Sequence, residues 1–228
     1  MSRVAWSAVI FDLDGTLLDT LADLADSMNS VLEALGYPTH PVDAYRNFVG
    51  DGVTNLVKRA LPPEWHERAH REHGFLEKCV DSMREAYELR WAIKTAPYPG
   101  IPELLRELGE RGIRMAVLSN KPHDFTAKIV AHFLGSVRFG AVLGAREGVP
   151  RKPDPACVRE ALRTVGARDE ETLYVGDSST DMDTARNAGL ISVGVLWGFR
   201  TEEELLEHGA HHLVARPREL LRYFPGNA

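Results

Sequence analysis

The sequence reads Phe11-Asp12-Leu13-Asp14-Gly15-Thr16-Leu17 directly after an apolar run at 6–11. A short apolar run rich in β-branched residues predicts a buried strand. The glycine that follows the two aspartates allows the chain to turn tightly there. Ligands of parallel sheets bind beyond the carboxyl ends of the strands. We therefore expect Asp12 and Asp14 to project into a ligand-binding crevice.

The same kind of apolar run recurs along the chain and alternates with helical patterns. Two helices are indicated by apolar stripes at 3.6-residue spacing, one from Ile101 to Leu108 and one from Val158 to Val165. Such alternation favours a Rossmann-like, three-layer α/β core with a parallel sheet covered on both faces. The further predicted strands are 113–118, 141–143, 172–175, 191–196 and 212–215.

One long segment breaks this alternation, because residues 19–96 contain no convincing strand. An apolar stripe begins after Thr20-x-x-Asp23, which has the pattern of a capping box. The segment ends at Pro97-Tyr98-Pro99-Gly100, a stiff connection. We predict a helical domain at 19–96 inserted into a core made of 1–18 and 97–228. Its further predicted helices are 42–48, 53–60 and 64–91.

Composition excludes several partners. The 228 residues carry 27 Lys and Arg against 33 Asp and Glu, a net charge of −6, so no broad basic field is expected to attract nucleic acid or an anionic membrane. The N-terminal apolar run is too short for a membrane helix, and a cytoplasmic location is predicted. Cys79 and Cys157 lie far apart, which favours two buried free thiols.

A second acidic motif reads Gly176-Asp177-Ser178-Ser179-Thr180-Asp181 after the predicted strand at 172–175. Asp177 follows the strand end, and Asp181 falls one turn into the next helix. Either aspartate alone is explained by the preference for acidic groups at a helix N-terminus. Gly-Asp-Ser also occurs in serine hydrolases, but no histidine of this chain follows an Asp-x-x-His pattern, which disfavours that class.

Two smaller elements follow other core strands. Ser119 and Asn120 come directly after the strand at 113–118, and Lys152 precedes a helix in a loop stiffened by two prolines. Singly, these are an ordinary loop serine and an ordinary surface lysine. Because all four elements follow core strands, they can converge on one crevice.

Together these motifs resemble the haloacid dehalogenase superfamily, whose phosphatases carry Asp-x-Asp-Gly-Thr, a Ser or Thr, a Lys and Gly-Asp-x-x-x-Asp in this order. The resemblance covers the whole chain, and it implies that residues 19–96 form the family's helical cap. Asp14 separates the chain from the dehalogenases proper, which lack that aspartate and use no metal. The related phosphonatases need a cap lysine, and Lys58, Lys78 and Lys94 lie there without a matching context.

The resemblance also implies a mechanism for small phosphate monoesters. Asp12 is expected to be the nucleophile that forms an aspartyl-phosphate, and Asp14 the general acid and base. Mg²⁺ is the expected cofactor, held by Asp12, the backbone carbonyl of Asp14, and Asp177. The other implied site residues are Lys152, Ser119 and Asn120 on the phosphoryl oxygens, Asp181 orienting Lys152, and Gly15 and Thr16 as supporting residues.

Three segments resemble phosphoglycolate phosphatases in particular: 49–61, 119–122 and 195–198. This resemblance implies hydrolysis of 2-phosphoglycolate to glycolate and phosphate, with Gly50, Asp51 and Gly52 as a cap loop facing the site. A substrate carboxylate could meet Lys121, Arg46 or Arg59, although each is equally explained as a surface cation. The expected partner is a small phosphorylated metabolite.

Other functions fit the same core residues. A β-phosphoglucomutase-like phosphotransferase and a pyrophosphatase remain open, since they differ in the cap and in the phosphoryl acceptor. A phospho-aspartate switch is disfavoured, because it predicts a smaller single domain without a cap. Neither a monomer nor a homodimer is excluded.

Overall fold

The computed structural model describes residues 6–224. The chain divides into two compact units: unit 1 takes the described residues up to Asp19 and from Pro97 onward, and unit 2 comprises Thr20–Ala96. The chain leaves unit 1 after β2 (Leu18–Asp19) and returns at β3 (Ala96–Pro97), and these two short strands form a sheet of their own.

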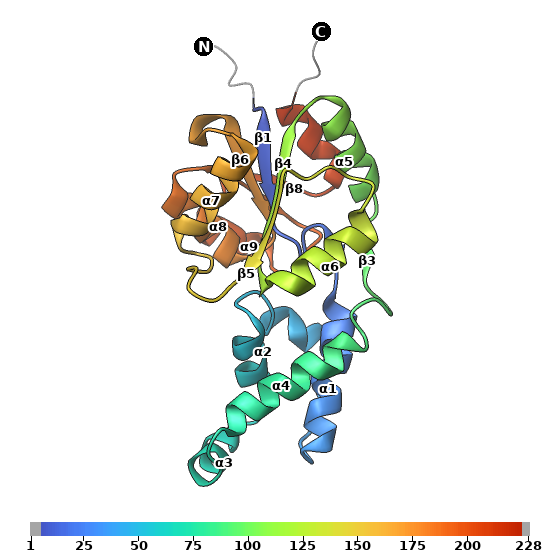
Figure 1. The fold of residues 1–228 in the computed structure, drawn as a ribbon, viewed down its shortest axis with the longest axis vertical. Helices are drawn as coiled ribbons and strands as arrows, with labels where there is room; N and C mark the ends of the chain where they lie inside the picture. The colour runs from blue at the N-terminus through green and yellow to red at the C-terminus, as the bar shows by residue number, and fades with distance from the viewer. Residues whose placement is uncertain (1–5, 225–228) are drawn as a thin grey trace. The chain divides into compact units, whose positions relative to one another are not determined.

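Unit 1 contains a six-stranded parallel sheet in the order β5-β4-β1-β6-β7-β8 (Figure 1). The predicted parallel α/β core is confirmed. Because β1 lies between β4 and β6, its carboxyl end lies in the interior of the row of strand ends and not at an edge strand. The strands are β1 (Ala8–Phe11), β4 (Arg114–Pro122), β5 (Ala141–Ala145), β6 (Thr172–Gly176), β7 (Ile191–Val195) and β8 (His212–Val214).

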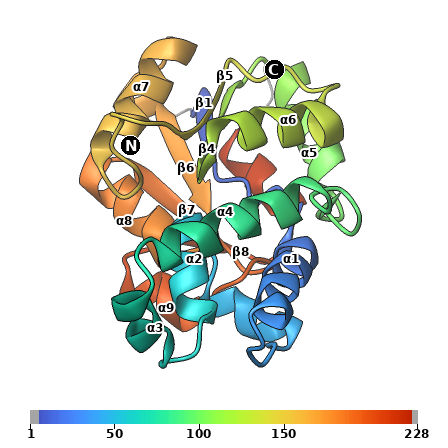
Figure 2. The ribbon, with the colours of Figure 1, turned by 60° about the horizontal axis from the view of Figure 1, so that its bottom comes forward.

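Helices cover both faces of this sheet. In Figures 1 and 2, α7 and α8 lie on one side of it, and α5 and α6 lie on the other. The helical segments of unit 1 are α5 (Ile101–Glu110), α6 (His123–Leu134), α7 (Pro155–Val165), α8 (Ser179–Ala188), α9 (Glu202–Glu207) and the 3₁₀ segments η2 (Asp169–Glu171) and η3 (Pro217–Tyr223).

Alternate strand residues build the core under α7 and α8. Ile10 of β1 and Tyr174 of β6 are fully buried and belong to one cluster with Val158 and Leu162 of α7 and Ala185 of α8. Both faces of β1 are buried from Ala8 to Phe11. A strand covered on both faces has no polar side to show, which explains the continuous apolar run.

Unit 2 is helical, and one predicted helix was wrong. The expected single helix at 64–91 is two helices, because Gly74 adopts a left-handed conformation with φ of 75° between them. The predicted helix at 42–48 is a 3₁₀ segment. The helices are α1 (Leu21–Ala34), η1 (Val42–Asn47), α2 (Val53–Ala60), α3 (Trp65–Arg71) and α4 (Phe75–Glu88).

The predicted capping box of α1 was also wrong. Thr20 makes no side-chain cap hydrogen bond. The buried carboxylate of Asp23 instead accepts hydrogen bonds from the backbone N–H groups of Lys94 and Thr95 and from Thr95 Oγ1, at 2.7–3.0 Å. The two ends of unit 2 are therefore joined through a carboxylate whose partners lie about seventy residues away, which a local motif does not reveal.

Cys79 and Cys157 are both buried and free, which confirms that prediction. Within residues 6–224, no helix combines the length and apolar character needed to cross a bilayer.

Candidate active site

Two aspartates lie side by side at the carboxyl edge of the sheet. Asp12 follows β1 and Asp177 follows β6, and these strands are neighbours. The backbone N–H of Asp12 continues the pairing by donating to the carbonyl of Val175 at 2.9 Å. Asp181 joins them from the first turn of α8, so that one carboxylate oxygen of each of the three lies within 4.8 Å of the others.

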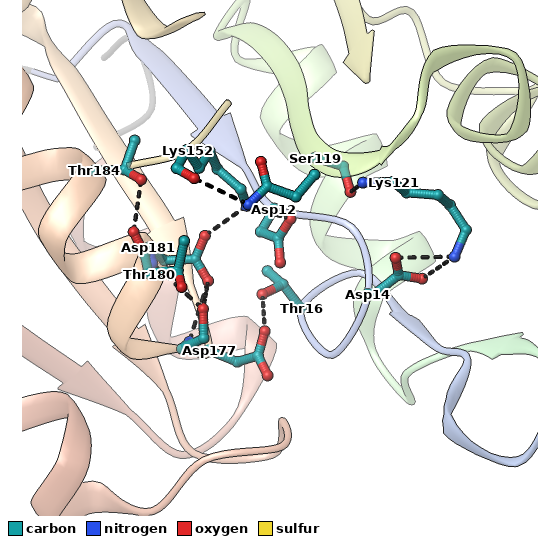
Figure 3. Close-up of polar contacts among 12 residues, drawn as sticks. Asp12, Asp14, Thr16, Ser119, Lys121, Lys152, Asp177, Thr180, Asp181 and Thr184 are labelled. Atoms are coloured by element: carbon teal, nitrogen blue, oxygen red, sulfur yellow. Dashed lines mark hydrogen bonds and ion pairs between the residues drawn. The ribbon is translucent and has the colours of Figure 1, made fainter. Parts of the chain in front are cut away.

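Asp12, Asp177 and Asp181 are called the carboxylate cluster here, and Lys152 connects two of them, Asp12 and Asp181. Its Nζ donates to Asp12 Oδ1 at 2.7 Å and to Asp181 Oδ1 at 2.8 Å (Figure 3). Its side chain is only 3% exposed, so it is no surface lysine. Asn120 Nδ2 donates to the Lys152 carbonyl at 3.1 Å and ties the loop to the end of β4.

Hydrogen bonds and glycines hold Asp177 in place. Thr16 Oγ1 donates to Asp177 Oδ1 at 3.0 Å, and the N–H of Phe199 donates to Oδ2 at 2.8 Å. A β-carbon added at Gly15, where φ is 91°, would lie 2.2 Å from Asp177 Oδ2. One added at Gly198 would lie 2.2 Å from Asp177 Cβ. Both positions therefore require glycine, which lets two loops close around one carboxylate.

Hydrogen bonds at the N-terminus of α8 fix the Asp181 side chain. Ser178 donates to Asp181 Oδ2 from its N–H at 3.1 Å and from its Oγ at 2.6 Å, completing a capping box. The Tyr174 hydroxyl donates to Oδ1 at 3.2 Å. Ser178 serves as the helix cap, which removes the remaining support for a serine nucleophile there.

The carboxylate cluster carries more negative charge than Lys152 balances. Burial raises the pKa of Asp12 well above its usual value; Asp181 and Asp177 add to this and Lys152 opposes it. Burial and then Asp181 raise the pKa of Asp177 to about 7, against the hydrogen bonds from Phe199 and Thr16. Burial alone would lower the pKa of Lys152, but the Asp12 and Asp181 carboxylates raise it well above 10.5. Lys152 is thus charged at neutral pH.

This donor set fits a divalent cation. Carboxylate oxygens are the hard ligands that Mg²⁺ prefers, and a cation would offset the repulsion that raises these pKa values. Asp12 and Asp177 belong to the cluster, as the sequence led us to expect. The expected contact of Asp14 runs through its backbone carbonyl and stays a prediction.

The side chain of Asp14 has a different partner. Lys121 Nζ donates to Asp14 Oδ1 at 2.8 Å and to Oδ2 at 3.0 Å, and Figure 3 shows this pair apart from Lys152 and Asp181. The side chains of Lys121 and Asp14 are 6% and 12% exposed, so the interpretation of Lys121 as a surface cation was wrong. Ser119 Oγ accepts from the Lys121 N–H at 3.2 Å.

The candidate residues of unit 2 make the following contacts inside that unit. Arg59 pairs with Asp51 and donates from Nη1 to the Phe48 carbonyl at 3.2 Å. Arg46 pairs with Asp43 at 3.3 Å on the exposed face of η1. Gly50 and Gly52 have φ of 123° and 87°. Positive φ explains both glycines as turn residues, and their role toward substrate stays a prediction.

Sequence reasoning missed several residues that shape the site. Tyr174 was predicted only as part of the strand at 172–175. Gly198 entered only through the resemblance at 195–198, and Phe199 was not singled out. Trp197 Nε1 also donates to the Thr16 carbonyl at 3.0 Å. For Trp197, Gly198 and Phe199 the available signal was their position just past β7, since β7 neighbours β6 in the sheet. Tyr174 lies on β6 itself.

Comparison with known proteins decides the family. The family described as "Haloacid dehalogenase-like hydrolase" matches residues 9–195, a range that includes the whole carboxylate cluster and Lys152. The chain belongs to this family. It is therefore an enzyme of the haloacid dehalogenase-like hydrolases, as its motifs indicated.

Named relatives of this hydrolase include phosphoglycolate phosphatases. The one from Pseudomonas syringae pv. tomato is 31% identical over 218 residues, covering 96% of this chain and 78% of the relative. The one from Psychrobacter arcticus is 32% identical and covers 86% of each chain.

Solved structures share the fold along nearly the whole chain. A protein from Lactobacillus delbrueckii subsp. bulgaricus has a TM-score of 0.86 at 32% identity, covering 98% of this chain and 100% of the other. A predicted phosphoglycolate phosphatase from Haemophilus somnus has a TM-score of 0.87 at 25% identity, covering 96% and 98%.

Proposed function

We propose that the site at the carboxyl edge of unit 1 hydrolyses small phosphate monoesters, with Asp12 as the nucleophile and Mg²⁺ as the cofactor. One observation carries the proposal: Asp12, at the end of the central strand, has Oδ1 fixed 2.7 Å from the Lys152 ammonium and lies beside Asp177. A carboxylate aligned in this way is preorganised to attack the phosphorus atom of an anionic phosphoryl group that neighbouring cations have drawn in.

Phosphate monoesters resist hydrolysis because their negative oxygens repel a nucleophile and their alkoxide is a poor leaving group. Lys152, charged and buried, supplies a cation for the phosphoryl oxygens, and the buried Ser119 hydroxyl is proposed to supply a further donor. When bound, Mg²⁺ neutralises further phosphoryl charge, and Asp12, Asp177 and the Asp14 carbonyl are the groups proposed to hold it. Asp181 keeps Lys152 in position through the 2.8 Å ion pair.

Two aspartates then divide the reaction into two steps. Asp12 forms a bond to phosphorus as the ester P–O bond breaks, and Asp14 gives a proton to the departing alkoxide. Water next attacks the aspartyl-phosphate and loses its proton to Asp14, which releases inorganic phosphate and restores Asp12. Both residues finish in their starting states.

Phosphoglycolate is the proposed substrate. The proposal is supported by the names of the relatives and by Lys121, a buried ammonium beside Asp14 that suits a substrate carboxylate. Unit 2 is proposed to serve as a cap, with Gly50, Asp51 and Gly52 as its substrate-facing loop.

A phosphate-release assay tests the proposal. Purified enzyme is given phosphoglycolate, sugar phosphates, nucleotides and pyrophosphate with and without Mg²⁺. Turnover should require Mg²⁺, favour phosphoglycolate and fall by at least about 10³-fold in Asp12→Asn. Asp124→Asn, at an exposed position at the start of α6, is the control and should behave as the wild type. Equal turnover by Asp12→Asn and the wild type would refute the assignment of the nucleophile.

A further inference from the structure

Trp197 connects the loop that follows β7 to the loop that follows β1. It lies two residues past the end of β7, and its Nε1 donates to the Thr16 carbonyl at 3.0 Å. Thr16 is 0% exposed, so its carbonyl has no access to bulk water and needs a donor from the protein. The indole N–H therefore fixes the backbone of the β1 loop at Thr16.

Thr16 passes this constraint on to Asp177. Its Oγ1 donates to Asp177 Oδ1 at 3.0 Å (Figure 3). A threonine side chain is branched at Cβ and stiff about χ1, so the direction of its hydroxyl follows the backbone that carries it. Two hydrogen bonds thus join the loops that follow β1, β6 and β7, with Thr16 accepting one and donating the other.

The carboxylate of Asp177 has to be held because its neighbours repel it. One oxygen each of Asp12 and Asp181 lies within 4.8 Å of one of its oxygens, and carboxylates at this distance repel one another. Phe199, two residues after Trp197, donates its N–H to Asp177 Oδ2 at 2.8 Å. The segment 197–199 therefore holds one oxygen of Asp177 directly and the other through Thr16.

We propose that Trp197 is a positioning residue that acts through Thr16 to hold Asp177 ready for Mg²⁺. The inference rests on the cofactor and the function proposed above. Without the indole N–H, the buried Thr16 carbonyl loses its donor and the Thr16 hydroxyl loses its fixed direction. Part of the binding energy of the cation is then spent on bringing Asp177 into place. Residues that orient metal ligands in this way are typically worth about 10–100-fold in metal affinity.

The test measures Mg²⁺ affinity by calorimetry in the wild type, Trp197→Phe, Thr16→Val and the double variant. Each single change should weaken binding about 10-fold, since one removes the indole N–H and the other the hydroxyl. Because both break the same connection, the double variant should also be about 10-fold weaker and not about 100-fold weaker. Thr16→Ser keeps the hydroxyl and should bind more tightly than Thr16→Val. Trp65→Phe, at a half-buried tryptophan of α3 in unit 2, is the matched control and should bind like the wild type.

Two outcomes would overturn the inference while leaving the proposed function intact. Trp197→Phe could bind Mg²⁺ as tightly as the wild type. The double variant could instead be about 100-fold weaker, which would mean that Trp197 acts independently of Thr16. Thermal unfolding checks that each variant folds, and Trp197→Met replaces Trp197→Phe if that variant does not. A wild type that binds no Mg²⁺ would refute the proposed cofactor, and the inference with it.

Discussion

Replacing Lys152 with methionine tests how the carboxylate cluster is held together. The change keeps the length of the side chain and removes its charge, so Asp12 and Asp181 lose the ammonium 2.7 and 2.8 Å away. The side chains of Lys152, Asp12 and Asp181 are 3%, 10% and 0% exposed, so water cannot replace it. We expect the metal-free Lys152→Met protein to be markedly less stable than the wild type.

The magnitude follows from the burial. Removing one partner of a buried ion pair costs about 3–5 kcal/mol. For a chain of this length, each kcal/mol lowers the melting temperature by roughly 2–4 °C, so a fall of about 6–20 °C is expected at pH 8. The deficit should shrink at pH 5.5, because Lys152 lowers the pKa of Asp12, and without it the buried carboxylates take up protons more readily and shed their charge.

Thermal unfolding of the metal-free protein, followed by circular dichroism at both pH values, measures this. Lys128→Met is the control, since loss of an exposed lysine changes stability by no more than about 0.5 kcal/mol. A Lys152→Met protein that melts within about 1 °C of the wild type at pH 8 would refute the reasoning. So would a deficit that is larger at pH 5.5 than at pH 8.

Three further predictions concern Asp177 and its surroundings. Folding raises the pKa of Asp177 from 3.8 to about 7, so its contribution to stability is present below pH 3.8 and is lost as the pH rises to about 7. Urea unfolding of the metal-free proteins should show this fall of the unfolding free energy with pH in the wild type and not in Asp177→Asn. The same pH dependence in both proteins would contradict the prediction. Added Mg²⁺ should stabilise the wild type more at pH 8 than at pH 5.5, since a ligand must be ionised. Gly198→Ala should weaken Mg²⁺ binding at least about 10-fold by calorimetry, because the added β-carbon would lie 2.2 Å from Asp177 Cβ. Gly109→Ala is the control and should bind Mg²⁺ like the wild type, since the nearest atom to its added β-carbon is 3.9 Å away. Equal affinities of the two variants would refute the packing argument.

Sequence patterns predicted the core well for a physical reason. β1 is buried on both faces, so its composition alone indicates a central strand. The aspartates that follow β1 and β6 then meet because parallel neighbours end at the same edge. Local patterns therefore carried enough information to anticipate that Asp12 and Asp177 lie together.

The same patterns failed where a residue's role depends on distant partners. Asp23 matched a capping box, yet it binds the backbone at Lys94 and Thr95. Lys121 was equally explained as a substrate contact or as a surface cation, and β4 places its buried side chain against Asp14. Gly74 separates two helices where a single helix at 64–91 was predicted. In each case tertiary contacts or a single backbone angle decide the structure, and neither is visible at short sequence range.

The central claim is that the phosphoryl group passes through Asp12, and chemical trapping tests it most directly. Enzyme turning over phosphoglycolate with Mg²⁺ is quenched and reduced with borohydride, which converts an aspartyl-phosphate to homoserine, and its peptides are read by mass spectrometry. The account predicts homoserine at position 12, dependent on substrate and absent from Asp12→Asn. Phosphate released in the same samples with aspartate intact at position 12, or with the phosphoryl group on Ser119, would contradict it.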